Sequence, residues 1–307
     1  MSLPQRIAVN GASGLIGTAL IGHLKSEGHT VQKLVRRPVV SPDEVSWDPR
    51  TGNVDLAPLE GVDAIIHLAG ANVGDKRWTK KYRAEILNSR LLGTTAISHA
   101  VSQLKPQVFI SSSAIGWYGE TGNRAVTEND RPGDDFLAAV CKEWEAAADL
   151  ATDTRVVKIR TGLVLDPTGG ALGKMLPLFK FGLGGKLGNG KQWWSWITLH
   201  DHIRAICYLL EKPIEGAVNL TSPNPATNQE FTSALARAMH RPALFPVPSF
   251  ALKITLGGFS TEILGSKKVI PQNSMMLVLL LITRISLRRS LRLLISNNCF
   301  RNETTAQ

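Results

Sequence analysis

Three glycines close together near the start of the chain constrain its fold more than any other feature. The stretch VNGASGLIG places Gly11, Gly14 and Gly17 between a predicted strand over 6–10 and a predicted helix over 14–26. A glycine turn between a strand and a helix is typical of phosphate-binding loops, because the first amides of the helix are free and lie at the positive end of its dipole.

Each glycine has its own expected role in such a loop. Gly11 allows the tight turn, Gly14 lets the backbone approach a pyrophosphate, and Gly17 lets the helix pack against the strand. The alternative is a glycine turn that serves packing alone. The predicted phosphate-binding loop consists of Gly11, Ala12, Ser13, Gly14, Leu15, Ile16 and Gly17.

Strands and helices alternate through the first half of the sequence. This alternation predicts βαβ crossovers, and therefore an α/β fold with a Rossmann-type, doubly wound parallel sheet. The expected strands cover 30–35, 64–69, 108–112 and a segment that begins at 155. The expected helices cover 134–150 and 78–104, the latter with a break near Ser89 or Gly93.

The composition of the sequence changes after Pro167: glycines become frequent, and a cluster of tryptophans follows. Residues Thr227 and Glu230 form the pattern of a capping box that opens a helix ending near Met239. We therefore predict a Rossmann domain over 1–166, to which later segments also contribute strands. A smaller C-terminal substrate lobe over 167–272 and a divergent tail over 273–307 complete the expected organisation.

Composition and charge exclude several classes of protein. Apolar residues make up 43% of the 307 residues and charged residues 20%, which is a globular balance. Three widely spaced cysteines argue against a disulfide framework or a metal site, and we expect no metal. With no signal peptide and no apolar run of about 18 residues, we expect a cytoplasmic protein with membrane contact unlikely. The oligomeric state is not readable from the sequence.

The net charge of +10 is compatible with nucleic acid or with an anionic cofactor. Basic and aromatic residues are not interleaved, so no nucleic-acid partner is expected. The second predicted strand ends in Arg36 and Arg37, with no acid before Asp43. An acid at this place would hold the free ribose hydroxyl of NAD, whereas an arginine suits the 2′-phosphate of NADP. The sequence therefore favours NADP, and a solvated arginine pair is the alternative.

Longer motifs together resemble one family. They resemble the extended short-chain dehydrogenase/reductase superfamily and, within it, an atypical branch, the epimerase family of NADP-dependent oxidoreductases. The resemblance runs from about residue 5 to Gln272. Its motifs are GASGLIG at 11–17, WDP at 47–49, HLAGANV at 67–73, EILNSR at 85–90, SSSAIGWYG at 111–119, KEWE at 142–145, RTGLVL at 160–165, NLTSPNPATN at 219–228 and KVIP at 268–271.

The resemblance implies further cofactor contacts. Leu68 and Ala69 would line the adenosine half of the cofactor, and Leu163 would lie near its nicotinamide end. Glu85 and Arg90 are implied as contacts from the long helix, where Glu85 would fix the arginine. An exposed ion pair within the helix, worth under ~1 kcal/mol, is the alternative for these two residues.

The same resemblance raises a catalytic question. Typical members use Ser, Tyr and Lys, with the last two spaced YxxxK on a helix. Lys142 stands at the lysine position, but Ala138 replaces the tyrosine and has no proton to give. Tyr118, expected at the carboxyl end of the sheet, is a candidate substitute that could polarise a carbonyl, with Ser112 or Ser113 orienting the substrate. The alternatives are an aromatic pocket wall for Tyr118 and a solvated helix face for Lys142.

The tail departs from the family pattern after Gln272, where relatives continue with Asp-Ala-Gly-Phe. Reading the codons of Met275, Met276 and Leu277 one base earlier would encode Asp-Ala, so we predict a frameshifted C-terminus. The competing interpretation is a genuine basic amphipathic segment that contacts a membrane or a partner.

The function predicted from the sequence is an NADP-dependent oxidoreductase or epimerase that acts on a small carbonyl or hydroxyl compound. The alternative is a non-catalytic NADP-binding sensor or regulatory protein, because the usual tyrosine is missing.

Overall fold

The computed structural model describes residues 3–272 and 286–304, with side chains as far as Ser296. The chain divides into two compact units, which are described separately below. The first unit comprises residues 1–119, 132–161 and 203–218, and the second comprises 120–131, 162–202 and 219–307. The sequence predicted a domain boundary after residue 166, with strands of the sheet also contributed by later segments, and this division stays a prediction.

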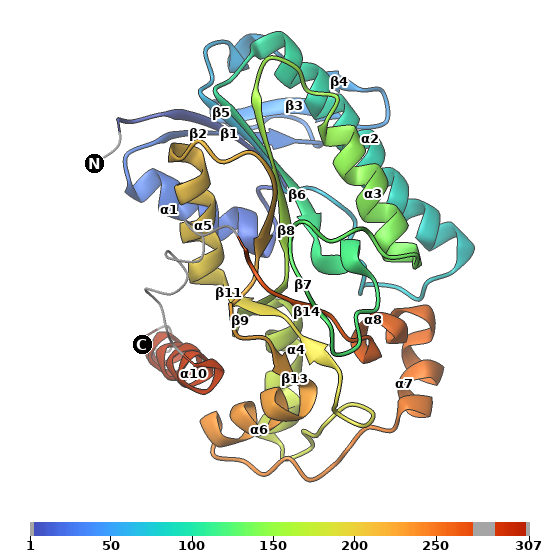
Figure 1. Ribbon diagram of the computed structural model, residues 1–307. Coiled ribbons are helices and arrows are strands. Elements are labelled where there is room, and N and C mark those ends of the chain that lie inside the picture. The colour runs from blue at the N-terminus through green and yellow to red at the C-terminus, as the bar shows by residue number, and fades with distance from the viewer. Residues whose placement is uncertain (1–2, 273–285, 305–307) are drawn as a thin grey trace. The chain divides into compact units, whose positions relative to one another are not determined.

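The first unit is built on an eight-stranded sheet in the order β12-β8-β6-β5-β1-β2-β3-β4 (Figure 1). Strands β8, β6, β5, β1, β2 and β3 pair in parallel, and β4 pairs with β3 in the antiparallel sense. The strands are β1 (Arg6–Asn10), β2 (Thr30–Val35), β3 (Glu44–Asp48), β4 (Asn53–Val54), β5 (Ala64–His67), β6 (Val108–Ala114), β8 (Arg155–Thr161) and β12 (Gly216–Leu220).

Helices cover both faces of this sheet, as the predicted doubly wound fold requires (Figure 1). Helices α1 (Leu15–Ser26) and α5 (Leu199–Glu211) lie on one face, and α2 (Lys80–Leu104) and α3 (Phe136–Ala148) pack together on the other. Because both faces are covered, the middle residues of the central strands are apolar: Ile7, Ala8, Val9, Ile66, Phe109 and Ile110 are fully buried. Two short 3-10 helices, η1 (Ala57–Leu59) and η2 (Ile115–Tyr118), complete the unit.

Helix α2 is continuous, so the predicted break near Ser89 or Gly93 is wrong. The Ser89 hydroxyl donates to the carbonyl of Ile86 one turn earlier, which the helix tolerates. Gly93 serves close packing, because a Cβ at this position would lie 3.5 Å from the ring of Trp47 and 3.6 Å from that of His67. The hydrogen bond of Ser89 and the close packing at Gly93 therefore explain why these residues occur within a continuous helix.

The second unit has its own apolar core, formed around Leu165, Trp196, Phe231 and Leu235. The predicted capping box is confirmed: Thr227 and Glu230 exchange hydrogen bonds at the start of α6. The elements are β7 (Ala125–Val126), β9 (Leu163–Asp166), α4 (Gly170–Lys180), β10 (Trp193–Trp194), β11 (Trp196–Thr198), β13 (Ala226–Thr227), α6 (Asn228–Ala238), α7 (Ser249–Leu256), η3 (Gly257–Phe259), α8 (Ser260–Leu264), β14 (Lys268–Val269) and α10 (Leu287–Thr304).

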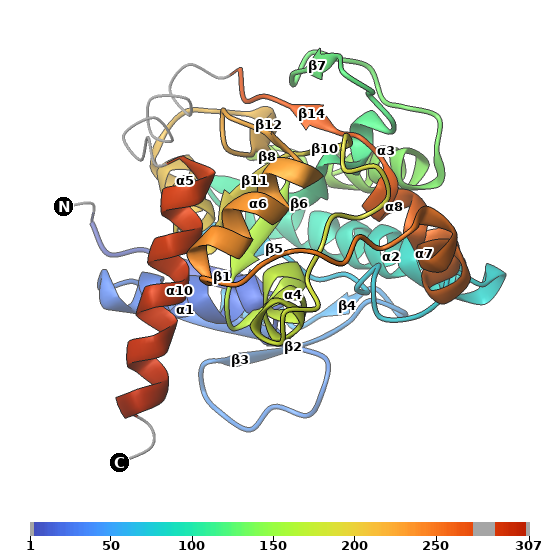
Figure 2. The same ribbon diagram turned by 90° about the horizontal axis from the view of Figure 1, so that it is seen from below.

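Part of the divergent tail belongs to this core. Residues 273–285, which include the segment that motivates the predicted frameshift, lie outside the described residues. Helix α10 packs along α6, and its Leu291 is fully buried in the core of the second unit (Figure 2). Among the described residues, no helix combines the length and apolar character that crossing a membrane requires.

Candidate functional site

The glycine turn has the geometry that the sequence predicted. Gly11 has a φ of 80°, and a Cβ there would lie 2.8 Å from the backbone of Leu68. A Cβ on Gly17 would lie 2.2 Å from the carbonyl oxygen of Gly11, so only glycine lets α1 approach the turn this closely. Gly14 differs, because its nearest neighbour is the oxygen of Gly11 at 3.4 Å. The side of the loop at Gly14 is therefore open.

The start of α1 offers backbone donors to a ligand. Gly14 is the N-cap and provides no side chain to accept from the first amides. Within the described part of the chain, no acceptor contacts the amides of Leu15, Ile16 or Gly17, and the first turn carries no acid. These amides lie at the positive end of the helix dipole, so the site fits an anion.

A second loop lies against the glycine turn. Leu68 and Ala69 follow β5 directly, and both are the nearest backbone to Gly11. The neighbouring Gly70 packs on the guanidinium of Arg90, 3.3 Å from where its Cβ would lie. The predicted contacts Leu68, Ala69 and Arg90 are therefore brought together with the glycine loop at one edge of the sheet.

Arg90 is partly buried and has no acid beside it among the described residues. Its guanidinium donates to the carbonyl of Ala71 (2.9 Å) and to that of Ile86 (3.1 Å), and it lies 4.8 Å from the ring of Trp144. In the part of the chain that the structure describes, no carboxylate contacts it. Burial lowers the pKa of Arg90, but an arginine keeps its proton at any physiological pH. A positive charge is thus held beside the loop with no negative partner.

The predicted pairing of Glu85 with Arg90 is wrong. Glu85 is exposed and lies 3.6 Å from the Nζ of Lys76. Residues five apart on an α-helix point in directions about 140° apart, so the two side chains leave α2 on different faces. Glu85 therefore does not fix Arg90.

The two arginines after β2 differ in their surroundings. Arg37 forms a bidentate ion pair with Glu44 (2.8 and 2.5 Å), which lowers the pKa of that carboxyl to about 2. Arg36 is exposed and has no hydrogen-bond partner among the described side chains. The sequence pointed to an arginine pair, but only Arg36 presents an uncommitted guanidinium. Glu44 was overlooked because it reaches Arg37 from the next strand.

A buried cluster occupies the carboxyl ends of β6 and β8. Arg160 donates through Nε and Nη2 to both oxygens of Glu145 (2.8 and 2.9 Å), and through Nη1 to the hydroxyl of Tyr118 (3.0 Å). Ser113 donates to Glu145 at 2.7 Å, and the guanidinium stacks on Trp117 at 3.9 Å. Burial lowers the pKa of Arg160, but the hydrogen bonds and charge of Glu145 outweigh it, so the net shift is upward.

The candidate catalytic residues fall into two groups: Tyr118 and Ser113 belong to this cluster, whereas Ser112 and Lys142 do not. The Tyr118 side chain is 3% exposed and accepts from a permanent cation, while the Ser113 hydroxyl is committed to Glu145. Ser112 on β6 is partly exposed, and Lys142 on α3 is exposed; neither has a side-chain partner among the described residues. Ala138, at the expected tyrosine position, is fully buried.

Sequence reasoning missed Arg160 and Glu145, the centre of the cluster. One signal was available: Glu145 lies on the buried stripe of α3, with Cys141 four residues before it and Ala148 three after. An acid on an apolar stripe indicates a buried partner. The remaining candidate, Leu163, lies in β9 of the second unit, where it pairs with Trp196. No cluster of three or more metal-ligating side chains occurs within the described ranges.

A parallel sheet wound on both faces, with a glycine turn between its first strand and first helix, defines the class of Rossmann-type α/β proteins. The sequence matches the model of the NAD dependent epimerase/dehydratase family over residues 7–221, and the chain belongs to this family. It is 42% identical over 269 residues to an epimerase family protein of Mycobacterium leprae, covering 86% of this chain and 88% of that protein.

Solved structures agree with this assignment. The human epimerase family protein SDR39U1, crystallised with NADPH, is 32% identical and superposes with a TM-score of 0.85 over 95% of this chain and 99% of that one. A nucleoside-diphosphate sugar epimerase from Corynebacterium glutamicum is 29% identical with a TM-score of 0.64, covering 99% of this chain and 68% of that one.

Proposed function

We propose that the protein binds NADPH in the first unit and is an NADP-dependent oxidoreductase or epimerase for a small carbonyl or hydroxyl compound. The observation that carries the proposal is the pairing of an open glycine turn with a partly buried arginine, Arg90, that no carboxylate contacts among the described residues. A buried charge is costly unless it is paired, so a site that holds one in its free form is built for a charged ligand.

Three groups would hold the cofactor. The amides of Leu15 and Ile16, next to the open side of Gly14, would receive the pyrophosphate. Arg90 would neutralise an anionic group beside the loop at Leu68 and Ala69. Arg36, with Arg37 held in place by Glu44, would contact the 2′-phosphate. The human relative crystallised with NADPH supports this choice of cofactor.

The chemistry would follow from the cofactor, because the nicotinamide supplies a hydride when bound. The residues of this chain would position the substrate and handle a proton. Ser112 is the most available group for this task, since its hydroxyl is partly exposed and uncommitted. Lys142 would contact the ribose from α3.

Tyr118 is better suited to positioning than to proton transfer. Its hydroxyl is a partner of Arg160, and its side chain is almost completely buried. A general acid must reach the reacting oxygen directly or through one water. We therefore assign Ser112 the direct contact, and place Tyr118 and Ser113 in the support around Glu145.

Calorimetry with the full chain tests the proposal. We expect saturable heat with NADPH, and binding of NADH weaker by about tenfold or more because the 2′-phosphate contacts are missing. Oxidation of NADPH in the presence of a panel of carbonyl compounds, followed by absorbance, tests turnover. The proposal is abandoned if correctly folded protein gives no heat with either nucleotide.

A non-catalytic NADPH sensor is the second candidate. It is favoured by the fully buried Ala138 at the tyrosine position and by the engagement of Tyr118 with Arg160. Tight NADPH binding without turnover on any carbonyl or hydroxyl compound, and without loss of binding in Ser112→Ala, would decide for the sensor.

A further inference from the structure

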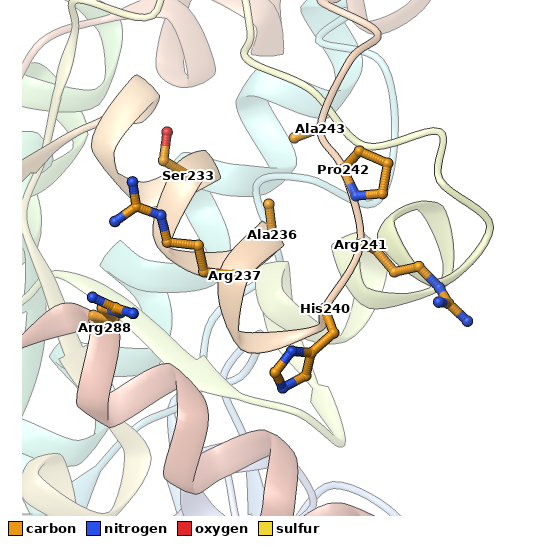
Figure 3. Close-up of a pocket in the computed structure, with 8 residues that line it drawn as sticks. All are labelled: Ser233, Ala236, Arg237, His240, Arg241, Pro242, Ala243 and Arg288. Carbon is orange, nitrogen blue, oxygen red and sulfur yellow. The ribbon is translucent and has the colours of Figure 1, made fainter.

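The second unit contains a hollow whose lining includes none of the residues proposed to hold the cofactor. Its volume is about 650 Å³, and it lies between the end of α6, the chain that follows it, and the first turn of α10 (Figure 3). Ligand pockets in proteins measure about 300–1,000 Å³, so the hollow has room for a small molecule. No acid lines it.

Two arginines and a serine lie on one side of the hollow. Ser233 and Arg237 are four residues apart on α6 and therefore share a face of this helix, while Arg288 comes from the first turn of α10. Figure 3 shows Arg237 and Arg288 on the same side of α6, whereas Arg241 points to the other side of the end of this helix. Arg241 donates to the carbonyl of Lys180 at 3.3 Å instead. We call Ser233, Arg237 and Arg288 the basic side of the hollow.

The side chains of the basic side are available to a ligand. Among the described residues, none of the three has a hydrogen-bond or ion-pair partner. Arg237 lies in the last turn of α6, where a cation interacts favourably with the helix dipole. Arg288 lies in the first turn of α10, which carries no acid and where a cation opposes the dipole. The position of Arg288 is therefore unfavourable for its own helix, and an anion between the two arginines would compensate for it.

The rest of the lining includes an apolar part. Ala236 is buried in the core cluster of this unit, Ala243 packs against that cluster, and Pro242 precedes Ala243 in the chain. These three side chains carry no hydrogen-bonding group, so they suit the organic part of a ligand better than a second charged group. The hollow is also much larger than a single phosphate ion requires.

We propose that the hollow binds a small phosphate monoester, with its phosphate between Arg237 and Arg288 and its organic part against Ala236, Pro242 and Ala243. A phosphate monoester carries a charge of about −1.5 to −2 at pH 7 and three strong acceptor oxygens.

These properties match two guanidinium groups and the hydroxyl of Ser233, which donate to the phosphate oxygens. A carboxylate carries a single negative charge and would leave one arginine without a counter-ion. The basic side therefore favours phosphate over carboxylate.

Calorimetry with phenyl phosphate tests the proposal on the full chain. We expect saturable binding that is weakened about tenfold or more in the Arg237→Gln/Arg288→Gln variant, because charge-assisted hydrogen bonds are lost. Arg241→Gln is the matched control, since Arg241 borders the same hollow but points away from the basic side, and it should bind like the parent. Both substituted arginines of the double variant are exposed, so its thermal unfolding should match that of the parent.

Three further titrations identify what is bound. Phenyl sulfate has nearly the same shape but one charge less, and we expect it to bind about fivefold more weakly or worse. Inorganic phosphate lacks the organic part and should bind about threefold more weakly or worse, because no apolar surface is removed from water. NADPH also carries phosphate groups, so phenyl phosphate is titrated again in its presence, and its binding should not change.

Several results would overturn the proposal. The absence of saturable heat, or equal binding by the parent and the double arginine variant, would show that the basic side holds no phosphate. Equal binding of phenyl sulfate would remove the charge argument, and equal binding of inorganic phosphate would remove the role of the apolar lining. Displacement of phenyl phosphate by NADPH would place the binding in the cofactor site.

Discussion

Two arginines of the first unit, the buried Arg160 and the partly buried Arg90, have opposite surroundings. Arg160, at the ends of β6 and β8, satisfies Glu145 and Tyr118. Arg90, beside the glycine turn at the ends of β1 and β5, donates to backbone carbonyls and lies over the ring of Trp144, and no carboxylate contacts it within the described ranges. A buried ion pair is costly to break, because removal of one partner leaves an uncompensated charge, whereas a charge that lacks a counter-ion marks a place for a ligand. The cluster around Arg160, which we call the closed region, supports the carboxyl ends of β6 and β8. The surroundings of Arg90 beside the glycine turn form the open region, where we expect a ligand to bind.

The largest expected effect is on the closed region. Glu145→Ala leaves Arg160 buried without a carboxylate, and we expect a loss of about 3–5 kcal/mol in the free energy of unfolding. Glu143→Ala, on the exposed side of the same helix, should change it by no more than about 0.5 kcal/mol. Urea unfolding measures both. Equal, small effects of the two changes would mean that the pairing of Arg160 does not stabilise the unit.

Low pH should lower the stability of the fold through a buried histidine of the open region, His67. Neither ring nitrogen of His67 has a partner among the described residues, and burial lowers its pKa to about 3 from an ordinary 6.5. Burial also lowers the pKa of His202 in the second unit, to about 4. Unlike Arg90, these side chains avoid the cost of a buried charge by staying neutral.

The sign of the pH dependence follows. Below pH 6.5 the unfolded chain binds protons that the folded chain does not, so the stability present above that pH falls as the pH drops towards 3–4. Each histidine should cost roughly 2 kcal/mol by pH 5. In His67→Leu, unfolding measured from pH 7.5 to 5 should show a shallower decline, with stability at pH 7.5 little changed. An unaltered slope would contradict the assignment.

Two glycines of the same turn should separate folding from binding. Gly17→Ala forces a Cβ into the carbonyl of Gly11, and we expect a loss of about 1–3 kcal/mol from overpacking. Gly14→Ala has room in the free protein and a φ of −78°, so its stability should be nearly that of the parent. We expect weaker NADPH binding in Gly14→Ala, measured by calorimetry, because its Cβ faces the open side of the loop.

The charge of Arg90 should matter for binding and not for folding. In Arg90→Gln the amide can still donate to the carbonyl of Ala71, so we expect a change in unfolding free energy of at most about 1 kcal/mol. Its affinity for NADPH should fall about tenfold. A variant that unfolds like Glu145→Ala would show that the two regions do not differ in the way described.

The smallest effect is expected at the end of β2, where the same contrast recurs on the surface. Arg36 is uncommitted and Arg37 is paired with Glu44. Arg36→Ala should reduce the preference for NADPH over NADH more than Arg37→Ala does, each by several-fold at most, because exposed charge pairs are weak. Competitive titration of the two nucleotides measures the preference. The opposite order would identify Arg37 as the selecting residue.

The local pattern of the sequence was sufficient to predict the glycine turn. The tight turn at Gly11 and the close packing of Gly17 were both expected from a strand, three glycines and a helix, and the structure confirms them. The capping box at Thr227 is another feature in which near neighbours decide the structure. In such cases the interacting residues are a few positions apart, so spacing alone carries the information.

Contacts between elements could not be predicted in this way. Arg160 and Glu145 come from β8 and α3, and their pairing depends on how the helix packs on the sheet. The proposed proton role of Tyr118 neglected this cluster, because a sequence does not show that its hydroxyl meets a buried guanidinium. Glu85 was placed near Arg90 from sequence proximity, although helical geometry separates them. The residues that bind a ligand remain predictions, since no local pattern distinguishes Ser112 from Ser113.

The chain changes from one unit to the other five times, after Gly119, Arg131, Thr161, His202 and Val218. Neither unit can therefore be produced by cutting the gene once, and a recombination event at a single point would leave both without essential strands. The second unit must then diversify in place, by substitution and by loop insertion. Proteins whose domains are contiguous in sequence can exchange whole domains by recombination. A protein with this architecture cannot.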